Sequence, residues 1–216
     1  MKISCGWIYA ISKYGYPPSL GDTYKAIEEM AEMGFKNIEL EGIGEENLKE
    51  IVKDKEKLKK IVEDLDLRVV NFCPVLPDIV SVEKERRDKA VQLFKIGIDT
   101  ARYFNCLTIQ TDSFTPSLKF IGEAPYKKGS SYGKEYKVKL EPDFNWQEQW
   151  KALVDTFAHC TSLAKDAGLK FCLEPRVGEL ISNTDAVLRL IDAIGDNNFG
   201  VLFDTAHQHT QRNYFL

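Results

Sequence analysis

Short apolar segments alternate with longer segments of helical period along the whole chain. The β-branched and apolar runs expected to form strands occupy residues 2–8, 37–40, 68–75, 107–111, 170–175 and 200–205. The amphipathic runs expected to form helices occupy residues 22–34, 46–66, 83–105, 146–168 and 183–195. Strict alternation of strand and helix predicts parallel strands that are joined by right-handed crossovers.

Two α/β architectures are compatible with this alternation, an open doubly wound sheet and a (β/α) barrel. The first loop, residues 10–21, contains no GxGxxG pattern, so nothing marks a dinucleotide site. Polar residues instead follow several different strands: Glu39, Glu41, Asn71, Gln110, Asp112, Glu174, Arg176, Asp204 and His207. Functional groups spread over many strand ends are typical of barrel enzymes, so we expect a TIM-type barrel over residues 1–216 as a single domain.

One connection is unusually long. Residues 113–145 separate the fourth expected strand from the next helix, where a βα loop commonly takes a handful of residues. The segment has six lysines against four acids, on a chain whose formal net charge is −4. It is either a lid that attracts an anionic substrate group or a solvated surface excursion with a small hairpin around Gly129 and Gly133.

Composition excludes several classes of protein. With 29 Lys and Arg against 33 Asp and Glu, and an isoelectric point near 5.5, the chain does not favour sequence-independent nucleic-acid binding. It has no apolar run long enough for a membrane span and no signal-like N-terminus. The five cysteines form no CxxC pair, which favours buried, reduced thiols in a cytoplasmic protein.

Glu174 and Asp204 are separated by one strand–helix–strand step, and each follows an apolar strand. Neighbouring parallel strands, spaced about 4.8 Å apart, would bring the two carboxylates together. Such a pair repels unless it shares a proton or a cation. A divalent metal (Mg²⁺ or Mn²⁺, or Zn²⁺ or Co²⁺ if an imidazole joins) is therefore one reading, and helix caps or salt bridges, for example with Arg176, are the other.

The three histidines differ in their context. His207 lies three residues after Asp204, which makes it a candidate ligand or substrate contact, and His209 is a weaker candidate. His159 lies inside an amphipathic run and is expected to be structural. Glu39 and Glu41 point the same way by the period of a strand, either into the barrel mouth or as polar strand-end residues.

The segments "FCLEPR" at 171–176 and "GVLFDTAHQH" at 200–209 resemble the fifth- and sixth-strand motifs of the xylose isomerase-like TIM barrels. "GFKNIELEG" at 34–42 is similar to the second strand of that family and "LTIQTDS" at 107–113 to the fourth. The superfamily includes isomerases and epimerases of sugars and sugar phosphates, and the endonuclease IV group. The resemblance covers essentially the whole chain.

The resemblance implies a function and a set of site residues. Glu174 and Asp204 match the first two of four family ligands of a divalent metal (Mn, Mg, Co or Zn), and Glu174 would also act as an acid/base in proton transfer through an ene-diolate. His207 matches a histidine that contacts substrate or metal. With Arg176, Glu39 and Gln110 as further substrate contacts, the resemblance implies a sugar or sugar-phosphate isomerase or epimerase.

The chain departs from this family at its end. Six strands are expected where the family has eight, so strands seven and eight, with two of the four ligands, are expected to be missing. Six strands leave two open sheet edges, which require pairing or cover. We expect a second copy in a homo-oligomer, or a complementing C-terminal fragment, to cover these edges.

Two other functions remain open at this point. One is a degenerate, non-catalytic barrel that binds a small polyol, which the expected absence of two ligands favours. The other is an endonuclease IV-like nuclease, which requires additional histidines at strand ends where this chain has Asn71 and Gln110. Neither a nucleic-acid partner nor a membrane is expected.

Overall fold

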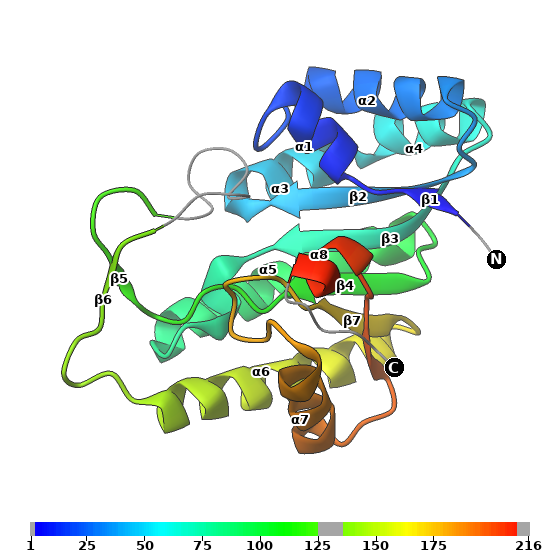
Figure 1. The fold of residues 1–216 in the computed structure, drawn as a ribbon. Helices are drawn as coiled ribbons and strands as arrows, with labels where there is room; N and C mark the ends of the chain where they lie inside the picture. Colours follow the sequence, from blue (N-terminus) through cyan, green and yellow to red (C-terminus); the bar gives the residue numbers. More distant parts are fainter. Residues whose placement is uncertain (1–2, 125–135, 211–216) are drawn as a thin grey trace.

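The computed structural model describes residues 3–124 and 136–210, which form a parallel sheet flanked by helices (Figure 1). Six parallel strands follow the order β1-β2-β3-β4-β7-β8, so successive strands of this sheet are also neighbours in space. They are β1 (Ser4–Cys5), β2 (Asn37–Ile43), β3 (Arg68–Val75), β4 (Thr108–Asp112), β7 (Lys170–Glu174) and β8 (Phe199–Val201). This α/β arrangement confirms the parallel strands predicted from the sequence.

Helices connect the strands and pack on the sheet. They are α1 (Ile8–Tyr14), α2 (Leu20–Glu32), α3 (Gly44–Lys53), α4 (Lys55–Asp64), α5 (Lys84–Tyr103), α6 (Trp146–Asp166), α7 (Thr184–Ile194) and α8 (Thr205–Thr210), with a 3-10 turn, η1, at Pro77–Val80. Figure 1 shows α8 in front of β3 and β4, while α6 and α7 lie on the side of β7. Asp204, the residue before α8, lies near Glu174 at the carboxyl end of β7.

The N-terminal strand is shorter than its sequence indicates. The expected strand at 2–8 is β1 alone, because Trp7 is the N-cap of α1 and the following residues are helical. The loop expected at 10–21 thus contains most of a helix. Helical backbone lets Trp7 bury its ring, which is 2% exposed, in the core beside β2.

The helix expected at 46–66 is two helices, with Asp54 between α3 and α4. The end of one helix and the start of the next thus share one residue. Each half buries its own apolar residues: Leu48 and Ile51 on α3, and Leu58 and Val62 on α4. A short bend at Asp54 lets both faces reach the core.

Helix ends follow the expected chemistry with one correction. The N-cap of α2 is Ser19, whose hydroxyl accepts from the Asp22 amide, so Asp22 lies inside the first turn and is not the cap. Gly34 and Gly168 follow α2 and α6 with positive φ, and Gly195 caps α7 in the left-handed region. Glycine has no Cβ penalty in that conformation, which is why these helices end there.

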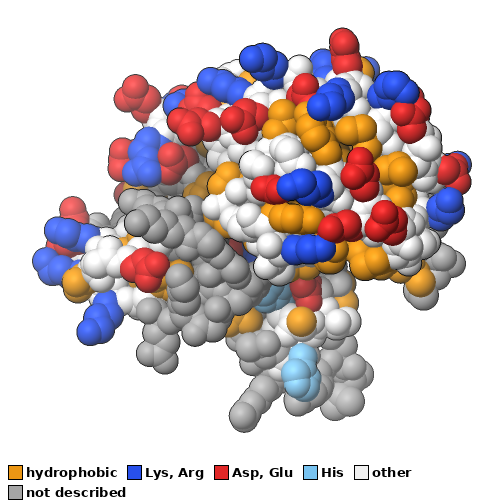
Figure 2. Space-filling view, turned by 90° about the horizontal axis from the view of Figure 1, so that it is seen from above, with side chains coloured by type: hydrophobic (Ala, Val, Ile, Leu, Met, Phe, Trp, Pro, Cys, Tyr) orange, Lys and Arg blue, Asp and Glu red, His pale blue; other side chains and the backbone are white. Residues whose placement is uncertain are grey.

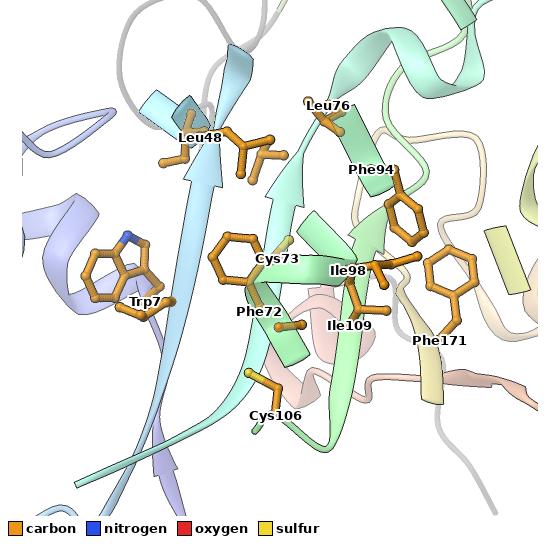
Figure 3. Close-up of a cluster of buried hydrophobic side chains, with 14 of the residues drawn as sticks. Trp7, Leu48, Phe72, Cys73, Leu76, Phe94, Ile98, Cys106, Ile109 and Phe171 are labelled. Atoms are coloured by element: carbon orange, nitrogen blue, oxygen red, sulfur yellow. The ribbon is translucent and has the colours of Figure 1, made fainter. Parts of the chain in front are cut away.

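The hydrophobic core lies between the sheet and the helices. Phe94 from α5 meets Phe171 from β7 edge to face, with ring centroids 5.2 Å apart, and Ile109 from β4 lies beside them (Figure 3). Phe157 from α6 contacts the same Phe171 ring at 5.6 Å. The five cysteines are free, and four of them are buried, in agreement with the thiols predicted from the sequence.

The two faces of the sheet differ in chemistry. Residues such as Leu40, Ile109 and Leu173 face the helices and are fully buried. The alternate positions carry polar side chains that lie next to one another across the sheet: Glu39 beside Asn71, Asn71 beside Thr108, and Asp112 beside Glu174. Among the described residues, β1 and β8 are the two edges of this sheet.

The long excursion contains a small antiparallel pair, β5 (Lys119–Phe120) with β6 (Val138–Lys139). The hairpin expected in this segment is therefore present at its base, while the turn around Gly129 and Gly133 lies outside the described residues. The excursion is anchored on α6, because the side chain of Gln149 accepts from the Ser117 amide and donates to the carbonyl of Val80.

Charged side chains are mixed on the face seen in Figure 2. Lys and Arg alternate there with Asp and Glu over the region where α2 lies, so this face carries no continuous basic patch. In the described part of the chain, no helix combines the length and apolar character that a membrane crossing requires.

Gly97 provides a test of how closely α5 packs on the sheet. A Cβ at this position would lie 2.8 Å from Cγ of Pro74 on β3. Replacing a mid-helix glycine by alanine ordinarily stabilises by about 1 kcal/mol, but overpacking costs about 1–3 kcal/mol. We expect Gly97→Ala to lower the free energy of unfolding by roughly 1 kcal/mol in urea titrations. Gly200→Ala, whose Cβ meets nothing within 4 Å, is the matched control; a stabilised Gly97→Ala would contradict this packing.

Candidate metal centre

Glu174 and Asp204 come together because β7 and β8 are neighbours. Leu173 of β7 is aligned with Val201 of β8, and the Leu202 amide donates to the Leu173 carbonyl at 2.8 Å. This pairing carries the chain past the end of β8 alongside Glu174. Asp204 follows two residues later, at the same carboxyl end of the sheet.

Asp204 is oriented by the start of α8. Its Oδ1 accepts from the Ala206 amide at 2.7 Å and from the His207 amide at 3.2 Å. The same turn places the His207 ring beside the carboxylate, with Nε2 3.9 Å from Oδ2 of Asp204. Among the described residues, one ligand atom each of Glu174, Asp204 and His207 lies within 4.8 Å of the others.

A buried ion pair borders this group. Arg176, two residues after Glu174, donates from Nη1 to Oδ2 of Asp112 at 2.5 Å. The Asp112 side chain is only 2% exposed and that of Arg176 is 22% exposed, so the carboxylate is buried while the guanidinium remains partly open to solvent. The Nε of Arg176 donates to Nε2 of His207 at 3.4 Å and lies 3.9 Å from Oε2 of Glu174.

A row of side-chain hydrogen bonds crosses the polar face of the sheet toward Glu174. Thr108 donates to Oδ1 of Asn71 at 2.7 Å, and Nδ2 of Asn71 donates to Oε1 of Gln110 at 2.5 Å. Nε2 of Gln110 then donates to Oε2 of Glu174 at 3.2 Å. Glu39 lies next to the row as the register partner of Asn71, and a hydrogen bond from the Asn71 side chain opposes the rise in its pKa that burial causes.

Burial dominates the electrostatics of the carboxyl groups. Loss of hydration, together with the negative charge of Asp112, raises the pKa of Glu174 to about 9 despite the opposing effect of Arg176. The same two causes raise the pKa of Glu41 to about 8. Burial also raises the pKa of Glu39, against hydrogen bonds from the Trp7 backbone and from Asn71. Several carboxyl groups here thus hold a proton more tightly than in water.

The pKa of His207 is lowered, in contrast to the raised pKa values of the carboxyl groups. Burial lowers its pKa, and the neighbouring Arg176 lowers it further. The imidazole is therefore neutral near pH 7, the form that offers a nitrogen lone pair to a metal or to a hydrogen-bond donor.

The donor set fits a divalent cation. Two carboxylates and a neutral imidazole suit Mn²⁺, Zn²⁺ or Co²⁺, with bonds of roughly 2.0–2.2 Å, so atoms within 4.8 Å of one another need only small side-chain movements to share an ion. A double positive charge would also offset the repulsion that now raises the Glu174 pKa.

The structure gathers most of the residues that the sequence singled out. Glu174, Asp204, His207, Arg176 and Gln110 form one connected group, and Glu39 reaches it through Asn71. His159 and His209 have exposed side chains outside this group.

Three residues that were not expected in the site lie at it or are coupled to its charges. Two of them had been noted only as polar residues at strand ends. Asp112 pairs with Arg176, and Asn71 links Glu39 to Gln110. Tyr16 is the third: burial and the negative charges of Glu41 and Asp112 raise its pKa. The two-residue period of β3 and β4 could have identified Asn71 and Asp112, whereas no local signal marks Tyr16.

Residues 27–215 match the family model described as the xylose isomerase-like TIM barrel. The chain belongs to this family. That membership confirms the fold class and the family that the strand-end motifs had indicated.

Three known proteins illustrate the relationship. A 61-residue segment is 30% identical to inosose dehydratase of Clostridium perfringens, covering 28% of this chain and 20% of that protein. The structure resembles 3-keto-D-glucoside 4-epimerase of E. coli (TM-score 0.72, 16% identity, 99% of this chain and 72% of that one). It also resembles the IOLI protein with a binding zinc atom (TM-score 0.67, 14% identity, covering 97% of this chain and 64% of that one). The chain thus spans about two thirds of the length of these solved structures.

The raised pKa of Glu41 predicts a specific pH dependence of stability. Between about pH 4.5 and 8 the unfolded chain loses this proton and the folded chain keeps it, so the free energy of unfolding falls by up to about 1.4 kcal/mol per pH unit as pH rises. We expect Glu41→Gln to remove this part of the slope in urea unfolding at pH 5, 6.5 and 8. Glu63→Gln, on the exposed face of α4, should retain it. Parallel pH profiles for wild type and Glu41→Gln would contradict the assignment.

Proposed function

We propose that this chain binds a divalent cation through Glu174, Asp204 and His207 and transfers a proton at the carbon next to a carbonyl of a sugar or sugar phosphate, as an isomerase or epimerase does. The observation that carries the proposal is the convergence of these three ligand atoms within 4.8 Å at the carboxyl end of the sheet. Active sites of (β/α) barrels lie at this end of their strands.

Glu174 is the residue proposed to move the proton. Burial and neighbouring carboxyl groups raise the pKa of Glu174 in the cation-free site, and a bound cation would lower it again, toward the range in which a carboxylate can accept a proton near pH 7. The bound cation would supply positive charge that stabilises the oxygen on which negative charge develops. Gln110 holds Oε2 of Glu174, so the carboxylate keeps one orientation toward the substrate.

The substrate-binding residues follow from the same geometry. Arg176 lies beside the metal ligands and carries N–H donors that suit the hydroxyl and carbonyl oxygens of a sugar. Asp112 holds the Arg176 guanidinium in place, so the donor is positioned before substrate arrives. Glu39, on β2, is the candidate for a further substrate contact, whereas Gln110, on β4, is enclosed between Asn71 and Glu174 and orients the Glu174 carboxyl.

Proton abstraction next to a carbonyl is compatible with both kinds of relative. An epimerase returns the proton to the opposite face of the carbon, whereas a dehydratase expels a neighbouring hydroxyl after the same first step. The inosose dehydratase segment and the 3-keto-D-glucoside 4-epimerase structure therefore support a common first step, and the fate of the carbanion distinguishes the two reactions.

Metal binding is the first test. We expect purified wild type to bind one equivalent of Mn²⁺ with micromolar affinity in calorimetric titrations. Glu174→Gln, Asp204→Asn and His207→Ala should each weaken binding by at least about 100-fold, more than outer-shell changes usually do. Asp185→Asn and Glu141→Gln, at positions outside the site, are matched controls that should bind like wild type. A wild type without Mn²⁺ affinity would overturn the proposed centre.

Proton abstraction can be tested without knowing the product. In D₂O with Zn²⁺, which is diamagnetic and does not broaden proton signals, ¹H NMR should show loss of the signal from the proton next to the carbonyl in a panel of ketoses, 3-keto-glucosides and inosose. Glu174→Gln should abolish the exchange by removing the base. Metal binding without exchange on any member of the panel would instead support a non-catalytic barrel that binds a polyol.

A further inference from the structure

We propose that Asn71 is a positioning residue for Glu174 that acts through Gln110. The inference rests on the proposed role of Glu174, and it adds a residue of β3 to a site that is otherwise built from β4, β7 and the segment after β8. Asn71 does not touch Glu174; the two are joined by the Gln110 side chain.

The row is enclosed by protein. Asn71 is 4% exposed and Gln110 is 5% exposed, so water cannot replace their partners freely. An amide that turns over inside such a row exchanges a donor for an acceptor, which mismatches any neighbour that is only a donor or only an acceptor; the Thr108 hydroxyl, which can do both, adapts. The direction of each amide is therefore set by its neighbours.

Two neighbours set the direction of Asn71. Thr108 donates its hydroxyl hydrogen to Oδ1 at 2.7 Å. The rise that burial causes in the pKa of Glu39, the register partner of Asn71 on β2, is opposed by a hydrogen bond that only Nδ2 of Asn71 can donate. With its oxygen and its nitrogen both engaged in this way, the amide of Asn71 has one favourable orientation. The remaining N–H of Nδ2 points to Oε1 of Gln110.

The direction of Asn71 determines the direction of Gln110. Because Oε1 of Gln110 accepts from Asn71, its Nε2 must face β7, where it donates to Oε2 of Glu174. A reversed Gln110 would place a carbonyl oxygen against the carboxylate and repel its ionised form. Asn71 on β3 thus orients Glu174 on β7 through the Gln110 side chain on the strand between them.

A purely structural role is the competing explanation, in which the row only satisfies buried amides. Both explanations predict that Asn71 variants lose stability. Only the positioning role predicts a changed donor at Glu174 and a coupled change in metal affinity, so the test measures those two properties.

The first readout is the Gln110 side-chain amide, observed by NMR in metal-free protein labelled with ¹⁵N-glutamine. The signal is assigned by its loss in Gln110→Ala. In wild type, the Gln110 N–H that donates to the Glu174 carboxyl should resonate downfield, and Glu174→Ala should remove that shift. Asn71→Asp, which keeps the shape but replaces the donor by an oxygen, should remove it as well. Thr108→Val is a milder second variant that should reduce it if Asn71→Asp does not fold.

The second readout is Mn²⁺ affinity. Asn71→Asp should weaken binding about 10-fold, within the 10–100-fold range of outer-shell residues. In a Gln110→Ala background the same substitution should have no additional effect, because the link is already broken. Asn198→Asp is the matched control, since Asn198 is also buried and donates to the Leu169 carbonyl away from the metal ligands; it should bind like wild type.

An unchanged Gln110 signal in both Asn71→Asp and Thr108→Val would overturn the positioning role. Equal losses of Mn²⁺ affinity in Asn71→Asp with and without Gln110 would overturn it too. If wild type binds no Mn²⁺, the proposed function fails, and the amide signal still decides whether Asn71 orients Gln110.

Discussion

Hydrogen bonds across the polar face of the sheet are the interaction on which the rest of the site depends. Parallel strands place Glu39, Asn71 and Gln110 side by side, and each of these side chains needs a partner because water is largely excluded. Every side chain finds a partner only if each amide keeps one orientation. The resulting chain of hydrogen bonds ends at the Glu174 carboxyl. The register of β2, β3, β4 and β7 therefore fixes the geometry of a carboxylate that is distant from β2 in the sequence.

The same burial gives the site its electrostatic character. Glu41 and Glu174 have pKa values of about 8 and 9, because burial and neighbouring carboxyl groups both oppose ionisation. The guanidinium of Arg176 offsets this only in part, since it is already paired with Asp112. A group of carboxyls that is costly to ionise, beside a neutral imidazole, is suited to a divalent cation, which compensates the charge that the protein leaves unbalanced.

Much of the fold could be predicted from the sequence, because burial leaves a clear local pattern. The strand expected at 68–75 is the observed β3, and the helices expected at 146–168 and 183–195 differ from α6 and α7 only at their ends. The expectation failed near Trp7, where an apolar run that looks like a strand turns into helix α1. It also failed at Asp54, where one periodic run is divided into two helices. In both places tertiary packing outweighed local propensity.

By itself, the sequence determined that the strands are parallel, that polar groups lie at their carboxyl ends, and that Glu174, Asp204 and His207 are candidates for one site. These properties depend on hydrophobic period and residue order, which are local. Only the tertiary structure decided that Asp112 holds Arg176, that Asn71 connects Glu39 to Gln110, and which carboxyl groups have raised pKa values. Those properties depend on strand register and on exclusion of water, and neither exists until the strands have paired.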